Sequence, residues 1–358
     1  MNKKILSLII PSYNMENFLN NCISSLVVSD ELMDAQEIII VNDGSKDNTL
    51  KIATDWANKF QNSIRIIDKK NGNYGSCINA ALNIATGTFV KVLDADDSFD
   101  THNYEDFLNL LIQSEEKNEN VDVFFSDFIM VDNEGNEIKK IAYPFNNSDI
   151  FSYEEFPDNI VEIMCMHALT YRTKKILELN YKQSEGISYT DQEWIFTPMA
   201  NMNSFRYFQK IIYKYLVGRD GQTISPESHA KNMWMELDCT KKMISDFVTI
   251  NSIASAGSKN YLEKKIFDRC RLMYEYYLLA FRNQMDLSQL LAFDSYLKEK
   301  LPNVYEQLIH ISYYGYSYIK SWRKYIVSSK LLPNNFYKKI GRKLLLIKIR
   351  KFLGLNNG

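Results

Sequence analysis

Cysteine is scarce in this sequence, and its pattern argues against covalent or metal cross-links. The chain of 358 residues has five cysteines, an odd number, and no two of them form a C-x-x-C pair. We therefore expect neither a disulfide framework nor a cysteine zinc site, and the pattern is typical of a reducing compartment. The cysteines are Cys22, Cys77, Cys165, Cys239 and Cys270.

Long apolar runs are also absent. No stretch approaches the roughly 20 apolar residues that a membrane-spanning helix needs. The first residues, MNKKILSLIIPSYN, look like a signal peptide, but their apolar run covers only residues 5–10 and stops at Pro11. A secretory core needs roughly 7–15 apolar residues. We expect this run to be a buried strand, and the protein to be cytoplasmic, either soluble or peripheral on the inner face of the cell membrane.

The net charge is close to zero, which argues against a nucleic-acid-binding protein. The 42 basic and 44 acidic residues give a formal net charge of −2. The charges are distributed unevenly, because residues 307–358 contain eleven Lys or Arg and no Asp or Glu. The rest of the chain therefore has a net charge of −13. We expect an acidic body followed by a basic tail.

Four short apolar runs alternate with amphipathic helical patterns in the first hundred residues. The runs are ILSLII, EIIIV, IRII and TFVKVL. This alternation is typical of a parallel sheet covered by helices on both faces. Gly87 stands where the C-cap of the third helix is expected. Ligands of such sheets bind beyond the carboxyl ends of the strands, where PSYN, NDGSKDNT and DADD lie.

The rest of the chain changes from mixed to helical patterns. After an expected helix at 101–117, the sequence VDVFFSDFIMV–DNEGNEI–IAYPF indicates an antiparallel hairpin. From Pro226 onward the pattern is helical, and no linker rich in Pro, Gly or Ser precedes it. We place a domain boundary near residue 225, which gives an α/β domain at 1–225 and a helical region at 226–358. The helices expected there are 227–250, 259–284, 286–299 and 303–327.

Three carboxylates, Asp94, Asp96 and Asp97, follow the fourth strand in the motif DADD. Clustered carboxylates at a crevice bind a hard divalent cation such as Mg²⁺ or Mn²⁺, together with the phosphates of a substrate. The alternative is a helix N-terminus, with Asp97 or Ser98 as its cap. These residues alone leave both interpretations open.

Two further motifs end neighbouring strands. In VNDGSKDNT, Asp43 stands at a strand end, where its carboxylate can accept a hydrogen bond from a base or a ribose. In PSYN, Tyr13 can stack on a planar base. Each motif alone is also compatible with a structural role, as a strand–turn–helix junction or as a core or rim aromatic residue.

Taken in order, these motifs resemble the family 2 glycosyltransferases of the GT-A fold, of the bacterial polysaccharide and cell-surface type. The resemblance depends on the strand before PSYN, on IIIVNDGSKDNT and on NGNYGSCINAALNIATGTFVKVLDADD. It is strong over residues 4–100 and traceable to about residue 225. The implied fold is a Rossmann-like mixed sheet flanked by helices, followed by an α-helical C-terminal region. Residues 1–100 would be its nucleotide-binding half and 101–225 its acceptor-binding half.

The resemblance implies roles for individual residues. Asp96 would bind the metal that bridges the diphosphate, as in the family's Asp-x-Asp motif, and Asp94 would contact the ribose. The family's Ala-Arg-Asn is Cys77-Ile78-Asn79 here, so the arginine and its phosphate contact are missing. The implied nucleotide-sugar-binding residues are Pro11, Tyr13, Asp43, Asn71, Gly75, Asn79, Asp94 and Arg219.

Later segments would supply the base and the remaining contacts. GISYTDQEWIF is similar to the family's Glu-Asp-x-x-aromatic segment, with Thr190 in place of the glutamate. It implies Asp191 as the catalytic base and Glu193 as the alternative, although the segment by itself also fits a helix cap at Thr190 or Asp191. His167 is implied to lie near the acceptor, or else to be a packed core histidine. Arg219 would contact phosphate in place of the missing arginine; the alternative is a surface turn.

The basic tail has a composition of its own. Residues 336–355, FYKKIGRKLLLIKIRKFLGL, combine seven basic residues with Leu, Ile and Phe. A basic amphipathic helix lies in the interface of an anionic membrane, which suits an acceptor carried on a lipid. The alternative is a helix packed on the preceding helices or against a second copy in a homo-oligomer.

These features and the resemblance predict a metal-dependent inverting glycosyltransferase that uses Mn²⁺ or Mg²⁺ and moves a sugar from a UDP-sugar to a hydroxyl acceptor. A lipid-linked intermediate of a bacterial surface polysaccharide is the expected acceptor, and a protein such as an adhesin is the alternative. A non-catalytic nucleotide-binding or scaffold protein is the rival interpretation, supported by Thr190 and the missing arginine. A Rossmann dehydrogenase is not expected, because no G-x-G-x-x-G follows the first strand.

Overall fold

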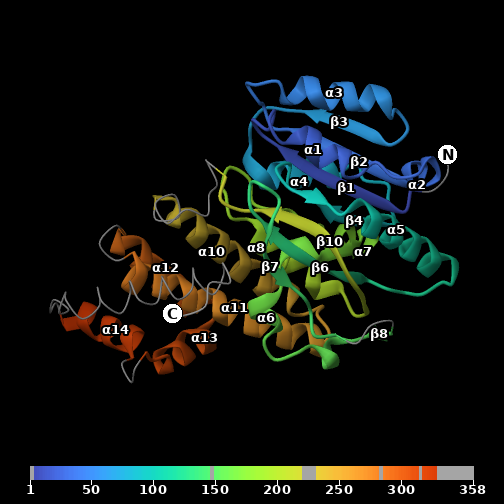
Figure 1. The fold of residues 1–358 in the computed structure, drawn as a ribbon. Coiled ribbons are helices and arrows are strands. Elements are labelled where there is room, and N and C mark those ends of the chain that lie inside the picture. The colour runs from blue at the N-terminus through green and yellow to red at the C-terminus, as the bar shows by residue number, and fades with distance from the viewer. Residues whose placement is uncertain (1–3, 146–148, 220–230, 282–284, 314–316, 329–358) are drawn as a thin grey trace. The chain divides into compact units, whose positions relative to one another are not determined.

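The computed structural model describes residues 4–145, 149–219, 231–281, 285–313 and 317–328. The chain divides into two compact units (Figure 1), one of Met1–Asp220 with Ile253–Lys259 and the other of Gly221–Ser252 with Asn260–Gly358. The boundary expected near residue 225 lies outside the described residues, as does the basic tail at 336–355. Among the described helices, none is both long and apolar enough to cross a membrane.

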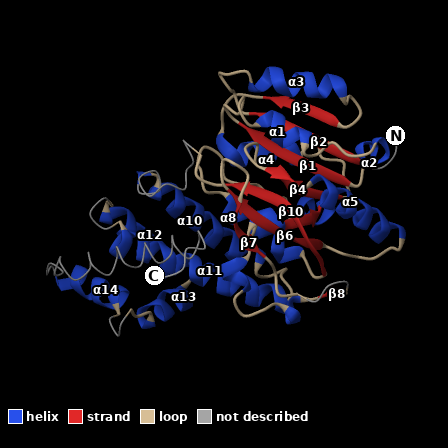
Figure 2. Cartoon of the chain, viewed as in Figure 1, coloured by secondary structure: helices blue, strands red, loops and turns tan. Residues whose placement is uncertain are grey.

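The described part of the first unit contains a ten-stranded mixed sheet with the order β3-β2-β1-β4-β9-β6-β10-β5 (Figure 2). β1 pairs in parallel with β2 and β4, and β2 with β3, so the four expected apolar runs are adjacent parallel strands. β7 pairs with β6, and β8 with β10. The strands are β1 (Leu6–Ser12), β2 (Gln36–Asn42), β3 (Ile64–Asp68), β4 (Phe89–Val92), β5 (Ser98–Phe99), β6 (Val123–Val131), β7 (Glu137–Ile141), β8 (Ile150–Phe151), β9 (Leu169–Arg172) and β10 (Phe205–Leu216).

Helices cover the central strands, which explains why β1, β2 and β4 are buried along their whole length. α3 packs on β2 and β3, where Figure 1 shows it beyond the edge strand, and α4 packs on β1 and β2. Strands buried on both faces form continuous apolar runs, as this sequence does. The helices of this unit are α1 (Leu19–Ser24), α2 (Asp30–Ala35), α3 (Thr49–Lys59), α4 (Asn73–Leu82), α5 (Thr101–Glu116), α6 (Ile160–Ile163), α7 (Thr173–Glu178) and α8 (Asp191–Trp194), with 3-10 turns η1 (Tyr153–Glu155), η2 (Met166–Ala168) and η3 (Thr197–Asn201).

The expected hairpin and helix of the second half are confirmed. β6 and β7 pair antiparallel, and α5 matches the helix expected at 101–117. Asp100 caps α5, because its side chain accepts a hydrogen bond from the Asn103 N–H at 3.2 Å. The alternative in which Asp97 or Ser98 caps this helix is therefore wrong, and the DADD carboxylates need another explanation.

Gly87 has a different role from the one expected. α4 ends at Leu82 with Asn83 as its C-cap, so the expectation that Gly87 caps this helix was wrong. Instead, Gly87 lies against β1, where a Cβ atom would be 2.4 Å from the Ser7 nitrogen and 2.7 Å from the Leu6 carbonyl carbon. Only glycine lets the two backbones approach this closely.

We expect Gly87→Ala to lower the free energy of unfolding by about 2 kcal/mol or more, because the added methyl group must push β1 out of position. Urea unfolding followed by circular dichroism measures the effect. Asn83→Ala, an exposed change in the same segment, is the control and should alter stability by about 0.5 kcal/mol or less. Equal midpoints for Gly87→Ala and the wild type would contradict the close approach.

The described part of the second unit is helical, as expected beyond residue 225. A single helix at 303–327 was wrongly expected: α13 ends at Gln307, and after η5 the backbone of Ile311 is extended, with φ −67° and ψ 127°. A buried ion pair between Glu236 and Arg269 joins α10 to α11. The elements are α10 (Met233–Ile250), α11 (Ala256–Glu275), the π-helix η4 (Tyr276–Ala280), α12 (Leu287–Lys300), α13 (Pro302–Gln307), η5 (Leu308–His310) and α14 (Tyr318–Ser328).

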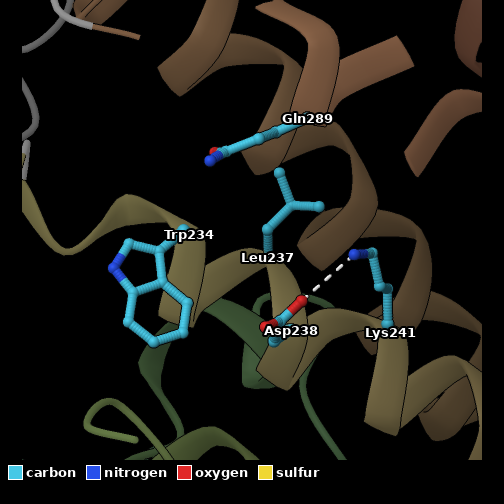
Figure 3. A pocket seen from close by; sticks show the side chains of 5 residues that line it. All are labelled: Trp234, Leu237, Asp238, Lys241 and Gln289. Carbon is cyan, nitrogen blue, oxygen red and sulfur yellow. Dashed lines mark hydrogen bonds and ion pairs between the residues drawn. The ribbon is translucent and has the colours of Figure 1, made fainter. Parts of the chain in front are cut away.

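A hollow of about 180 Å³ in this unit is bordered by α10 and α12 (Figure 3). The exposed ring of Trp234 forms one side of it. Asp238 is the one carboxylate among its lining residues, and it pairs with Lys241 at 3.1 Å. A single, already paired carboxylate is a poor ligand set for a divalent cation. The acidic motif DADD and the candidate base Asp191 both belong to the first unit.

Candidate active site

The DADD motif forms the loop between β4 and β5, and each of its three carboxylates has a different partner. Asp97 is buried and accepts hydrogen bonds from the Tyr213 hydroxyl at 2.6 Å and from the Leu216 N–H at 2.7 Å. Asp94 is half-buried and accepts one from the Tyr74 hydroxyl at 2.9 Å. Asp96 forms an ion pair with the Arg219 Nε at 2.5 Å. Hydrogen-bond donors and one cation therefore offset the repulsion among these like charges.

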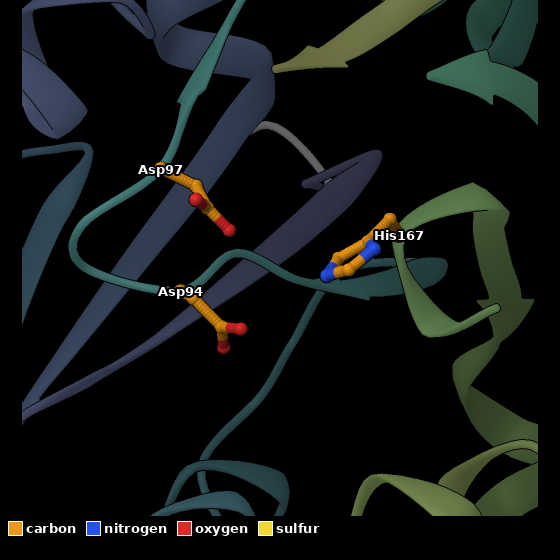
Figure 4. A group of neighbouring side chains, drawn as sticks. All are labelled: Asp94, Asp97 and His167. Carbon is orange, nitrogen blue, oxygen red and sulfur yellow. The ribbon is translucent and has the colours of Figure 1, made fainter. Parts of the chain in front are cut away.

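Asp94, Asp97 and His167 converge at this loop (Figure 4). One possible ligand atom from each lies within 4.8 Å of the other two. The His167 ring is buried and stacked on Tyr215, with centroids 4.5 Å apart, and its Nδ1 lies 3.1 Å from the Cys165 Sγ. Two carboxylates with one imidazole are a donor set that can hold a divalent cation.

The protonation states at this loop follow from burial. Burial, together with the neighbouring Asp96 charge, raises the pKa of Asp94 to about 7. The same two causes raise the pKa of Asp97 well above its usual range. Burial and the nearby Lys91 lower the pKa of His167 to about 3, which leaves the imidazole neutral. A cation releases protons from carboxyl ligands when it binds, and a neutral imidazole is ready to act as a ligand, so the residues fit a divalent metal.

Lys91 fixes the segment that carries His167. Its ammonium group is fully buried and donates hydrogen bonds to the carbonyl oxygens of His167 at 2.6 Å and Leu169 at 3.2 Å. β4 and β9 pair only at Phe89 and Val90, so these contacts continue the link where the strands separate. Lys91 was not predicted as a site residue; its one signal in the sequence is a single charge inside the apolar run TFVKVL.

The predicted nucleotide-binding residues gather at one edge of the sheet. The Asp43 carboxylate pairs with Lys69 at 2.5 Å and accepts a hydrogen bond from the Gly72 N–H at 3.0 Å. The Asn71 side chain donates to the Asp43 carbonyl at 3.0 Å. Tyr13, which follows the strand that contains the buried Pro11, is 43% exposed. The carboxyl ends of β1, β2 and β3 therefore place these groups together.

Asp191 and Glu193 differ in accessibility. Asp191 is half-buried, accepts a hydrogen bond from the Gln192 side chain at 2.9 Å, and acts electrostatically on Asp94 and Tyr74. Glu193 is 0% exposed, and its Oε2 accepts a hydrogen bond from the Ser184 N–H at 2.8 Å. Of the two candidate bases, Asp191 is the more accessible one and the one whose charge acts on Asp94.

The helix-cap alternative for this segment is confirmed in position, although no side chain makes the capping hydrogen bond. Thr190 occupies the N-cap position of α8 but makes no capping hydrogen bond with its side chain, and Asp191 is the first residue within the helix. The Thr190 hydroxyl instead accepts a hydrogen bond from the Gln183 side chain at 2.9 Å. Thr190 therefore stands at the start of the helix, but its hydroxyl is bound to Gln183 and not to the helix backbone.

Gly75, Asn79 and Arg219 complete the predicted set. Gly75 and Asn79 contact the loop at 183–185, since a Cβ atom at Gly75 would lie 2.0 Å from the Ser184 carbonyl oxygen and Asn79 binds the Gln183 backbone. Arg219 follows β10 and lies over the Phe18 ring at 5.3 Å while it pairs with Asp96. Two tyrosines that the sequence analysis did not single out, Tyr74 and Tyr213, connect these parts to the acidic loop.

Comparison with known proteins gives a family match for part of the chain and a shared fold. Residues 7–179 match the family described as "Glycosyl transferase family 2". The minor teichoic acid biosynthesis protein GgaB of Bacillus subtilis is 26% identical over 228 residues, which cover 64% of this chain and 25% of GgaB. Chondroitin synthase of Pasteurella multocida is 26% identical over 274 residues, covering 75% of this chain and 25% of the synthase. The chain thus spans about a quarter of the length of each of these relatives.

The structural likeness extends over most of the chain. The crystal structure of S. aureus TarS 1–349 in complex with UDP-GlcNAc superposes with a TM-score of 0.65 and 18% identity, covering 92% of this chain and 93% of that one. This likeness confirms the expected GT-A architecture, a mixed sheet flanked by helices with a helical C-terminal region.

Proposed function

We propose that this protein, whose residues 7–179 belong to glycosyl transferase family 2, transfers a sugar from a UDP-sugar to a hydroxyl acceptor with inversion at the anomeric carbon. The observation that carries the proposal is the arrangement of four carboxylates. Asp94, Asp96 and Asp97 form the loop after β4, and Asp191 comes from a separate segment close enough to act on Asp94. The three carboxylates of the loop can hold a metal together with the diphosphate, while Asp191 can take the proton of the acceptor hydroxyl.

The donor side would be formed by the sheet edge and the DADD loop. Tyr13 would stack on the uracil and Asp43 would accept its N–H, with Pro11 and Asn71 beside them. Asp94 would contact the ribose. TarS has been crystallised with UDP-GlcNAc, which supports a uridine nucleotide as the donor type for the shared fold.

A divalent metal would be held by Asp96, with Asp94, Asp97 and His167 as the neighbouring donor set. Such an ion offsets the charge that develops on the departing diphosphate. Arg219 would exchange Asp96 for the phosphate oxygens, since its guanidinium already lies at this carboxylate and can bind two oxygens at once. In this way Arg219 would replace the arginine missing at Ile78.

The base would be Asp191. Inverting transfer needs a carboxylate on the face opposite the leaving group, where it accepts the proton of the attacking hydroxyl. Asp191 is partly accessible, whereas Glu193 is enclosed and bound to the Ser184 backbone. The proton of the acceptor would move to an Asp191 oxygen as the new glycosidic bond forms and the bond to UDP breaks.

The acceptor would be a growing cell-surface polysaccharide, carried on a lipid at the inner face of the membrane. By their names, GgaB takes part in minor teichoic acid biosynthesis and chondroitin synthase makes chondroitin, and the sequence of the basic tail suits an anionic membrane. His167 was predicted to contact the acceptor; its burial beside Asp94 and Asp97 favours the metal instead. Transfer to a protein is the alternative, distinguished by whether labelled sugar enters the lipid or the protein fraction.

We expect one UDP-sugar to release UDP when the purified protein is incubated with Mn²⁺ or Mg²⁺. The screen compares UDP-glucose, UDP-galactose and their N-acetyl forms, measures UDP by a coupled assay, and includes EDTA as the control that should stop release. Mn²⁺-dependent binding of UDP without release from any of these donors would contradict the proposal and favour a nucleotide-binding scaffold. Release only from GDP- or dTDP-sugars would overturn the uridine assignment.

A further inference from the structure

We infer that helix α4 sets the position of Asp191 relative to the donor site, and that Asn79 is the positioning residue that transmits it. The inference rests on the proposed function, because it assumes that Asp191 is the base. It assigns Asn79 the role of positioning the segment that carries Asp191, although the family resemblance implies that this residue lies near the nucleotide.

Asn79 holds the backbone of a single residue in the loop before α8. Its Oδ1 accepts a hydrogen bond from the Gln183 N–H at 2.9 Å, and its Nδ2 donates to the Gln183 carbonyl oxygen at 2.9 Å. The side-chain amide therefore pairs with both polar groups of one residue, as a neighbouring strand would. The Nδ2 also donates to the Glu185 carboxylate at 2.8 Å. These hydrogen bonds fix the distance of the loop from α4 and determine which loop residue faces Asn79.

Gln183 passes this position on to the residue before the base. Its side chain is buried, and its Nε2 donates hydrogen bonds to the carbonyl and the hydroxyl of Thr190, both at 2.9 Å. The next residue, Ser184, donates its N–H to the enclosed Glu193 carboxylate at 2.8 Å. Thr190, directly before Asp191, and Glu193, two residues after it, are thus both bound to the segment that Asn79 holds.

Gly75 brings this loop directly against the helix. A Cβ atom there would lie 2.0 Å from the Ser184 carbonyl oxygen and 2.9 Å from its carbonyl carbon. The φ angle of Gly75 is not in the left-handed region, since α4 is regular there, so the glycine is explained by the contact alone. The loop therefore rests on the helix backbone, with no side chain between them to allow adjustment.

The other end of α4 holds the donor side. Tyr74, near its N-terminus, donates a hydrogen bond to the Asp94 carboxylate at 2.9 Å. One helix thus contacts Asp94, on the donor side, through Tyr74. Through Asn79 it contacts the loop that leads to Asp191. The rise of an α-helix, about 1.5 Å per residue, fixes the separation of these two contacts. A reaction between donor and acceptor requires such a fixed separation, because a displacement of about 1 Å can cost about 100-fold in rate.

The test is Asn79→Ala in the full-length protein, assayed with the donor found in the screen and a hydroxyl acceptor. We expect kcat for transfer to fall about 100-fold, while the KM for the donor and the Kd for UDP with Mn²⁺ stay within about threefold. Asn83→Ala is the matched control, because it is the same change at the exposed residue that follows the end of α4. It should retain wild-type kcat. Melting temperatures verify that each variant is folded.

Two results would overturn the inference. Unchanged kcat in Asn79→Ala would show that the pairing with Gln183 does not position the base. A UDP affinity at least tenfold weaker would show that Asn79 is a nucleotide ligand. If Asn79→Ala does not fold, Gln183→Met decides, since it removes the bonds to Thr190 and should lower kcat without changing UDP binding. Wild-type protein that binds UDP but transfers no sugar would instead contradict the proposed function.

Discussion

Replacing Asp191 with asparagine is expected to lower the rate of sugar transfer by a factor of about 10² to 10⁴, with little change in UDP affinity. The amide keeps the size of the carboxylate but cannot accept the proton of the acceptor hydroxyl, and general-base catalysis contributes roughly this much. UDP binding should persist, because the change removes a negative charge and so adds no repulsion toward the diphosphate. Initial rates at saturating donor, together with calorimetric titration of UDP, measure both quantities.

Glu193→Gln is the matched comparison for this prediction. Glu193 is enclosed and accepts the Ser184 N–H at 2.8 Å, and a glutamine oxygen can accept the same hydrogen bond. We therefore expect this variant to retain transfer within about tenfold of the wild type. The opposite pattern, with Asp191→Asn active and Glu193→Gln inactive, would move the base to Glu193 and require the segment to open during catalysis.

Replacing Asp96 with asparagine is expected to weaken Mn²⁺-dependent UDP binding by at least about 100-fold. A metal between a carboxylate and the diphosphate contributes most of the attraction for the phosphates, and an amide is a weaker ligand for a hard cation. The loss should appear only with Mn²⁺ present, so calorimetry is done with Mn²⁺ and with EDTA. Asp100→Asn serves as the control, because asparagine also caps a helix and Asp100 is the cap of α5.

The same titration distinguishes two possible metal sites. One outcome is that Asp96→Asn binds UDP with Mn²⁺ as the wild type does, while Asp97→Asn does not. In that case the cation is held by Asp94, Asp97 and His167, and the role of Asp96 is its ion pair with Arg219. If both variants lose binding, the ion is shared across the loop. If neither does, the DADD loop is not a metal site.

Much of the fold was predictable from the sequence because its signals are local. The runs ILSLII, EIIIV, IRII and TFVKVL became β1, β2, β3 and β4, since strands covered on both faces need continuous apolar residues. The hairpin of β6 and β7 followed from a turn signal between two apolar segments. The break between α13 and α14 was missed, because residues 303–327 contain no proline and a single glycine, which a helical pattern tolerates.

The candidate site could be predicted only in part. Asp43 directly follows β2, and Asp94 and Asp96 lie in the loop that follows β4, so the rule on strand ends placed them at one edge. Lys91 escaped notice because a lysine inside a buried strand cannot be explained without its distant partners, the carbonyl oxygens of His167 and Leu169.

The sequence alone determined the four apolar strands of the first hundred residues and their alternation with helices, the clustering of acids after β4, and the resemblance to the family 2 glycosyltransferases. Only the tertiary structure decided which acid meets which partner. It paired Asp96 with Arg219, grouped Asp94 and Asp97 with His167, enclosed Glu193 and turned Gly75 and Asn79 toward the loop before α8. The physical reason is distance along the chain. Periodicity and turn residues act over a few positions, whereas these contacts join residues about a hundred positions apart and arise only when the whole sheet is assembled.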